Sequence, residues 1–401
     1  MRTGEIMNTG DLVSLDLIRD LVGFDTTSRH SNLELIGYIR DYLARLGIES
    51  TLVPDATGQK ASLYATIGPQ DRGGILLSGH TDTVPVDNQI WSSDPFTLTE
   101  REGRLYGRGT ADMKSFVAIA LSYAPAFAAA DLKTPIHYAF SYDEEVGCIG
   151  VRPLIAHIGA LAVQPRMAII GEPTEMQIIC AHKGKLGMRC RVEGRSCHSS
   201  LAPRGVNAVE YAAEVVAHLR GMARRFASEG PFDPGFDIPH TTVHTGVFRG
   251  GTALNIVPSV CEFDFEFRYL PEEDPAALLA QVQRYAHETL EPEMKAVAPE
   301  AGFSWHELSS TPGLDTAPDD EVVTLAKALA GQNGHSKVAF ATEASLFQKS
   351  GGIPSVVCGP GNIDQAHNPN EYIELSEVAK GEAFMRRLLE IAEAGTLTAQ
   401  A

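Results

Sequence analysis

The sequence lacks the features of a secreted, membrane-spanning or disulfide-stabilised protein. Its six cysteines include no CxxC pair, and a chain of 401 residues can build a core without disulfide bonds. We therefore expect reduced thiols and a cytoplasmic location. No basic segment followed by an apolar core stands near the start, and no apolar run approaches the ~20 residues of a membrane helix. We accordingly expect neither a signal peptide nor a membrane partner.

Basic residues are also scarce. The chain has 33 Lys and Arg against 51 Asp and Glu, which gives a formal net charge of -18. A surface of this sign repels the phosphate backbone of nucleic acids, so we expect no nucleic-acid partner. The charge does not decide the substrate, because the field inside a site differs from the net charge.

The order of the predicted elements indicates two domains. Strands and helices alternate up to about residue 175, which predicts a mostly parallel sheet covered by helices. Within 183–312 the predicted order is β-α-β-β-α-β, the ferredoxin-like unit. We therefore predict an α/β fold in which residues 1–182 and 313–401 form one domain and residues 183–312 form an inserted α+β domain.

The stretch 78–85, SGHTDTVP, is the most informative part of the chain. It follows an apolar run, 74–77, that is typical of a buried strand. His80 lies where this strand ends, and Asp82 follows two residues later. In open α/β sheets ligands bind at the carboxyl ends of strands, so His80 is a candidate metal ligand oriented by a nearby carboxylate. A capping or hydrogen-bonding histidine is the alternative.

Further acidic and histidine residues follow other predicted strands or a glycine-rich turn, and the predicted topology gathers them at the same edge of the sheet. They are Asp112, Glu144, Glu145, Glu172 and His367. Taken singly, each has a simpler interpretation. Asp112 could cap a helix, Glu144 and Glu145 could be a solvated pair, Glu172 could belong to a turn, and His367 could lie in a surface loop.

Carboxylates gathered this closely favour a metal site. Without cations they would repel one another, and some would stay protonated. Two histidines and three carboxylates match a pair of zinc ions with one carboxylate between them. Glu144 and Glu145 can reach one site only at an irregular strand end, where one can hold a metal while the other contacts the attacking water. This division of roles is what metal-assisted hydrolysis requires.

The motifs SGHTDTVPV, YGRGTADMKSF, DEEVG, GEPT and AHNPNEY resemble those of the zinc-dependent aminoacylase/carboxypeptidase family of metallohydrolases. The resemblance covers nearly the whole chain. Within the family, the late stretches 342–345, 358–361 and 365–372 resemble the members that hydrolyse N²-acetyl-L-ornithine to L-ornithine and acetate in arginine biosynthesis. The resemblance implies two divalent metal ions, zinc or cobalt, and a homodimer that acts on a small N-acyl amino acid.

Other activities of the same family remain open. They are desuccinylation of succinyl-diaminopimelate, deacetylation of N-acetylcitrulline and carboxypeptidase-like dipeptide hydrolysis, because a shared fold does not decide the substrate. An inactive binding protein on this scaffold is a more remote alternative.

The resemblance implies a role for each metal-site residue. Asp112 would bridge the two metals, His80 and Glu172 would complete one site, and Glu145 and His367 would complete the other. In addition, Glu144 would move a proton from the water to the leaving amine, and Asp82 would orient His80. The peptide bond from Asp112 to Met113 would be cis.

The resemblance also implies that the inserted domain dimerises and closes over the substrate. His198, in the stretch SCHSS, would donate to the oxyanion in the partner subunit's site. Asn255 would contact the substrate from the lid. The alternative for His198 is an exposed loop histidine.

Four further positions are candidates for substrate recognition. Arg268 could pair with the substrate α-carboxylate, the alternative being an ion pair with a glutamate on its own strand face. The main-chain amides of Gly359 and Gly361 could form an anion nest. Glu343 is a candidate for the group that binds the δ-ammonium of ornithine. The alternative is that Glu343 is the N-cap of a helix.

Overall fold

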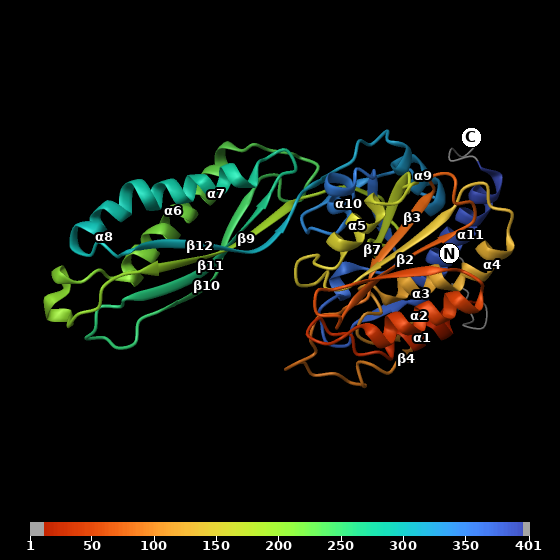
Figure 1. Ribbon diagram of the computed structural model, residues 1–401, viewed down its shortest axis with the longest axis horizontal. Coiled ribbons are helices and arrows are strands. Elements are labelled where there is room, and N and C mark those ends of the chain that lie inside the picture. Colours follow the sequence, from red (N-terminus) through yellow and green to blue (C-terminus); the bar gives the residue numbers. More distant parts are fainter. Residues whose placement is uncertain (1–11, 396–401) are drawn as a thin grey trace, which may run out of the picture. The chain divides into compact units, whose positions relative to one another are not determined.

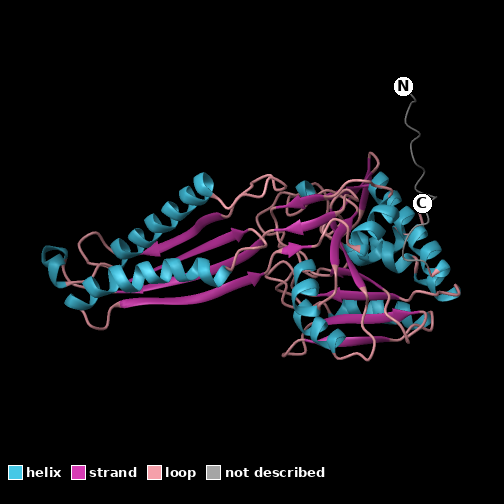
Figure 2. Ribbon diagram, turned by 90° about the horizontal axis from the view of Figure 1, so that it is seen from above, coloured by secondary structure: helices cyan, strands magenta, loops and turns pink. Residues whose placement is uncertain are grey.

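The structure is a computed structural model that describes residues 12–395. These residues form two compact units, drawn in Figures 1 and 2. The second unit consists of His182–Gly313 and Lys337–Ala341, and the rest of the described chain belongs to the first. The predicted insert, 183–312, leaves out 337–341, because the sequence does not mark this segment as part of that unit. Among the described residues, no helix combines the length and the apolar character needed to cross a bilayer.

The first unit contains a large, mostly parallel sheet with the strand order β1-β2-β6-β3-β7-β15-β8-β13. The strands β6, β3, β7 and β15 are parallel neighbours, while β1 and β2 pair antiparallel at one edge. The strand bounds are β1 (Ser50–Pro54), β2 (Ala61–Ile67), β3 (Ile75–His80), β6 (Ile136–Ser141), β7 (Met167–Pro173), β8 (Ile179–His182), β13 (Leu314–Asp315) and β15 (Ser355–Gly359). All residues of β3, β6 and β7 are buried, as expected for strands covered on both faces.

Helices cover both faces of this sheet (Figure 1). One face carries the main apolar core under α1 (Leu15–Val22), α2 (Leu33–Arg45), α3 (Lys114–Ser122), α4 (Ala124–Ala129), α9 (Glu321–Ala330) and α11 (Leu375–Ala394). The other face packs against α5 (Val151–Gly159) and α10 (Ala344–Gly351). A small sheet comprises β4 (Thr99–Arg101), β5 (Arg104–Tyr106) and β16 (Tyr372–Glu374), and the remaining short elements are β14 (Ser336–Val338) and a 3₁₀ turn (Ile363–Gln365).

The second unit has an antiparallel sheet in the order β10-β11-β9-β12. Its strands are β9 (Gly184–Glu193), β10 (Thr242–Gly250), β11 (Val260–Tyr269) and β12 (Gly302–Thr311). Its helical segments are a 3₁₀ turn (Ser199–Arg204), α6 (Ala208–Glu229), α7 (Pro275–Arg284), a π-helical turn (Tyr285–Leu290) and α8 (Glu291–Val297). In β11 every second residue is buried, so its apolar side chains face the helices and its charged ones face away. The ferredoxin-like prediction is confirmed.

The parallel strands of the first unit position the candidate site. The neighbouring strands β6, β3 and β7 run in one direction, so their carboxyl ends lie next to one another along the same side of the sheet. His80 ends β3, Glu144 and Glu145 follow the end of β6, and Glu172 is the second-to-last residue of β7. The fold therefore gathers residues that are separated by more than ninety positions in the chain.

Close packing beside this edge can be tested at Gly171. A Cβ atom there would overlap the ring of Phe116 on α3. We expect Gly171→Ala to lower the free energy of unfolding by about 1–3 kcal/mol, the usual cost of overpacking. The control is Gly37→Ala on α2, where nothing lies within 4 Å of the added carbon, and which should gain about 0.5–1 kcal/mol. Urea denaturation measures both, and a Gly171→Ala variant as stable as the wild type would contradict the packing described.

Candidate metal centre

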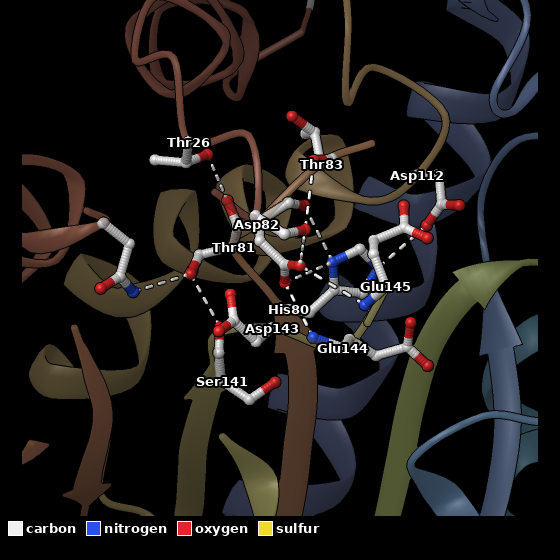
Figure 3. A network of polar contacts seen from close by, with 12 residues as sticks. Thr26, His80, Thr81, Asp82, Thr83, Asp112, Ser141, Asp143, Glu144 and Glu145 are labelled. Atoms are coloured by element: carbon white, nitrogen blue, oxygen red, sulfur yellow. Dashed lines mark hydrogen bonds and ion pairs between the residues drawn. The ribbon is translucent and has the colours of Figure 1, made fainter. Parts of the chain in front are cut away.

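His80 is almost completely buried at the end of β3. Its Nδ1 atom lies 3.0 Å from the main-chain oxygen of Asp82 and 3.4 Å from the Oδ1 atom of the same residue. Its Nε2 atom lies 2.9 Å from Oδ1 of Asp112 and 3.9 Å from Oε1 of Glu172. Asp82 is therefore placed to orient the ring, while the opposite ring nitrogen faces two carboxylates. Figure 3 shows His80 between Asp82 and Asp112.

Asp112 presents its two carboxylate oxygens to two different histidines. Its Oδ1 atom faces Nε2 of His80 at 2.9 Å, and its Oδ2 atom faces Nε2 of His367 at 3.3 Å. The peptide bond between Asp112 and Met113 is cis, as the resemblance implied. A carboxylate between two imidazoles has the geometry of a ligand shared by two metal ions.

The described residues contain two groups of side chains that could each hold a metal ion. The first group is His80, Asp112 and Glu172, and the second is Asp112, Glu145 and His367. Within each group the ligand atoms lie within 4.8 Å of one another. His367 Nε2 also lies 3.1 Å from Oε2 of Glu145. The structure thus brings together all five ligands predicted from strand ends and motifs.

The charges of these groups fit two divalent cations. Burial raises the pKa of Glu172 well above its usual range and that of Glu145 to about 6, with the negative charge of Asp112 adding to each effect. Burial alone would lower the pKa of His80, but Asp112 and Asp82 outweigh it and raise this pKa. The cluster therefore attracts positive charge. Divalent cations supply that charge while binding imidazole nitrogen and carboxylate oxygen.

Glu144 lies next to the two ligand groups. Its main-chain N–H donates to Oδ1 of Asp82 at 3.0 Å, and the N–H of Glu145 lies 3.4 Å from Oδ2 of the same carboxylate. Gly147, with a φ of 117°, helps the chain to turn after β6. Burial raises the pKa of the Glu144 side chain to about 8, supported by the neighbouring Glu145 and Asp112 carboxylates. A carboxyl group with this pKa can accept a proton near neutral pH and release it again.

A buried ion pair, which no local pattern in the sequence predicted, supports the backbone that carries Asp112. Nη1 of Arg108 lies 2.7 Å from Oε2 of Glu371, and both side chains are 1% exposed. Oε1 of Glu371 accepts hydrogen bonds from the main-chain N–H groups of Ala111 and Asp112, at 2.8 and 3.1 Å. Arg108 lies in the same motif as Asp112, and Glu371 lies in the same motif as His367. In both motifs only the candidate metal ligand was expected to have a functional role.

Gln89 extends this support to His367. Its Nε2 atom donates to the main-chain oxygen of His367 at 2.9 Å, and its Oε1 atom accepts from Nη2 of Arg108 at 2.6 Å. Gln89, Arg108 and Glu371 therefore connect the loops that carry Asp112 and His367. The sequence held no signal for Gln89, because its position in an irregular loop follows no periodic pattern.

We expect Glu371→Gln to weaken metal binding by about 10–100-fold, the usual effect of altering a group that holds a ligand in place. The amide keeps the shape of the side chain but leaves the buried Arg108 guanidinium without its counter-charge. Competition with a chelating dye measures the affinity. Glu374→Gln is the matched control, because Glu374 pairs with Arg104 at the surface. Unchanged affinity in a folded Glu371→Gln variant would contradict this role.

His198 and Asn255 lie on adjoining segments of the second unit. The N–H of Ser199 donates to the main-chain oxygen of Asn255 at 3.0 Å, and His198 forms an isolated β-bridge with Ile256. The exposed imidazole of His198 accepts a hydrogen bond from the N–H of Ser200 at 3.2 Å. Within this unit, the structure therefore places two of the predicted substrate-contacting residues side by side.

Arg268 makes the contact that was its alternative interpretation. Its Nε atom donates to Oε1 of Glu266 at 3.1 Å on the polar face of β11. The side chain is 29% exposed. The guanidinium is thus partly used by a neighbour on the same strand, and binding of a substrate carboxylate would compete with that ion pair.

Two other predictions on substrate contacts are corrected by the structure. The N–H of Gly359 donates to Oγ1 of Thr174 at 3.2 Å, and the N–H of Gly361 donates to Oε2 of Glu377 at 3.2 Å. Because both amides are used inside the protein, they do not form the predicted anion nest. Both oxygens of the buried Glu343 carboxyl group contact serine hydroxyls, those of Ser78 and Ser141, so its predicted contact with a substrate ammonium group is also wrong.

Comparison with known proteins identifies the family. Residues 76–391 match the model of peptidase family M20/M25/M40. The chain is 38% identical over 369 residues to the acetylornithine deacetylase of Proteus mirabilis, covering 91% of this chain and 92% of the relative. It is 36% identical over 385 residues to that of Photorhabdus laumondii, covering 94% and 96%.

Solved structures share the fold. The M20 family metallo-carboxypeptidase Sso-CP2 of Sulfolobus solfataricus superimposes with a TM-score of 0.75 at 18% identity, covering 97% of this chain and 100% of that one. A dinuclear metal-binding M20 peptidase of Bacillus subtilis has a TM-score of 0.67 at 16% identity, covering 95% and 98%. The family match spans most of the chain, and the curated relatives exceed one third identity over almost their full length. The chain therefore belongs to peptidase family M20/M25/M40 and is a metal-dependent hydrolase.

Proposed function

We propose that this protein hydrolyses N²-acetyl-L-ornithine to L-ornithine and acetate. The observation that carries the proposal is the pair of ligand groups sharing Asp112, with the Glu144 carboxyl group beside them. This arrangement suits hydrolysis of an amide bond. The choice of substrate is supported by curated relatives at 36–38% identity over most of the chain, all named acetylornithine deacetylase.

Two divalent ions, zinc or cobalt, would be held by His80, Asp112, Glu145, Glu172 and His367 in the two groups described above. When bound, the ions would supply Lewis acidity at the amide carbonyl and lower the pKa of the attacking water. Asp82 would keep the His80 ring oriented for binding.

Glu144 would carry the proton through the reaction. Its carboxylate accepts a proton from the water that attacks the acetyl carbonyl carbon. It then gives that proton to the amine nitrogen, so that the C–N bond breaks and ornithine leaves as an amine. Burial raises the pKa of Glu144, which favours its role as the group that takes up the proton.

We assign the remaining roles to the second unit, which would dimerise and close over the substrate. His198 would donate to the developing oxyanion in the partner subunit's site. Asn255 would contact the substrate, and Arg268 would meet the α-carboxylate if the substrate displaces Glu266. A cytoplasmic location would keep the six cysteines reduced.

Turnover of a panel of N-acyl amino acids, with zinc or cobalt supplied, tests the substrate. The panel contains acetylornithine, acetylcitrulline, acetylmethionine and succinyl-diaminopimelate. We expect the highest kcat/KM for acetylornithine, and a higher value for any other member would reject the choice. The control is the same protein after chelation, which should be inactive. An inactive binding protein on this scaffold would turn over none of the panel even with its metals retained.

A further inference from the structure

Glu343 lies beneath the metal centre and connects two of the strands that carry it. Its Oε1 atom lies 2.6 Å from Oγ of Ser78, and its Oε2 atom accepts a hydrogen bond from Oγ of Ser141 at 2.7 Å. Ser78 precedes His80 by two residues on β3, and Ser141 ends β6 three residues before Glu144. The carboxyl group is fully buried, and it makes no cap contact to α10, which begins at the next residue.

The hydrogen atoms in this network can be counted. The Ser78 hydroxyl has one hydrogen, yet its oxygen lies at hydrogen-bond distance from two acceptors, the main-chain oxygen of Ala139 at 3.0 Å and Oε1 of Glu343. An ionised Glu343 would leave one of these contacts as two oxygens without a hydrogen between them. A proton on Oε1 removes the conflict. Glu343 then donates to Ser78, Ser78 donates to Ala139, and Ser141 donates to Glu343.

Burial also disfavours a charge on Glu343. The charged groups that face it are His80, Asp82, Glu144 and Glu172, three of which are carboxyl groups. Burial raises the pKa of Glu343, while Ser78 and Ser141 lower it only in part. Removal of this carboxyl group from water by itself penalises its charged form.

We propose that Glu343 is a positioning residue that acts as a neutral carboxylic acid. It holds the ends of β3 and β6 together through Ser78 and Ser141, and so keeps His80 and Glu144 in place without adding negative charge to the metal centre. The proposal rests on the proposed function only for its activity measurement.

Two variants separate a neutral acid from a carboxylate. In Glu343→Gln the amide N–H₂ can donate to Ser78 and the amide oxygen can accept from Ser141, so this variant should keep kcat close to the wild-type value. Glu343→Ala removes both contacts and should lower kcat by about 10–100-fold with little change in KM. Loss of activity in Glu343→Gln equal to that in Glu343→Ala would overturn the proposal, as would wild-type activity in Glu343→Ala. If Glu343→Ala does not fold, Ser141→Ala removes one contact alone, and a kcat equal to that of the wild type would count against the proposal.

Infrared difference spectra give a measurement that needs no substrate. The spectrum of the metal-loaded wild type minus that of metal-loaded Glu343→Gln should contain the carbonyl-stretch band of a protonated carboxyl group, which shifts in heavy water. A difference spectrum that contains only carboxylate bands would overturn the proposal. Failure of the proposed function would show separately, as an absence of acetylornithine turnover in a wild type that retains this band.

Discussion

Glu144→Gln should lower kcat by about 10²–10⁴-fold, the contribution of a positioned general base, while the protein keeps its metal ions. The amide has nearly the same shape as the carboxyl group but cannot take a proton from water. The Glu144 main-chain N–H would still hold Asp82, so the orientation of His80 should not change. Stopped assays over a long time course measure the residual turnover, and elemental analysis of the dialysed protein measures the metal content.

The control for this variant is Asp143→Asn in the same loop. Asp143 pairs with Lys60 and belongs to neither ligand group, so its loss should leave kcat near that of the wild type. Wild-type turnover in a folded, metal-loaded Glu144→Gln variant would exclude Glu144 as the base. A large loss of metal in that variant would show instead that its carboxyl group is a ligand.

Asp112→Asn should remove metal from both groups and lower activity by about 10³-fold or more, because the ions contribute several kcal/mol to the stabilisation of the transition state. Asp112 is the only residue common to the two groups found among the described residues. A neutral amide offers each ion a weaker ligand and leaves the charge of both ions less balanced. The expected metal content after dialysis is therefore below one ion per chain.

This loss should exceed that of Glu371→Gln, which disturbs only the support of Asp112. Asp364→Asn is the matched control, because Asp364 is exposed in the segment leading to His367 and belongs to neither group. If Asp112→Asn kept two ions per chain after dialysis, Asp112 could not be the shared ligand.

The candidate metal ligands could be located from the sequence because their signal is local. His80 and Glu172 each end an apolar run, and the carboxyl ends of parallel strands meet at one edge whatever the details of packing. The alternation of apolar and charged residues along β11 is also a local signal, since period two follows from strand geometry alone. Pro125 likewise marks a boundary between two helices, because α3 ends at Ser122 and this proline lies in the first turn of α4.

The sequence by itself determined which elements form and which residues stand at their ends, because hydrophobic periodicity and turn residues act over a few positions. Only the tertiary structure decided how Glu371 supports Asp112 and how Glu343 connects Ser78 with Ser141. It also decided that the amides of Gly359 and Gly361 are used by Thr174 and Glu377. These contacts depend on how distant segments pack and on which polar groups lose water. No local sequence pattern predicts the packing of distant segments or the loss of water.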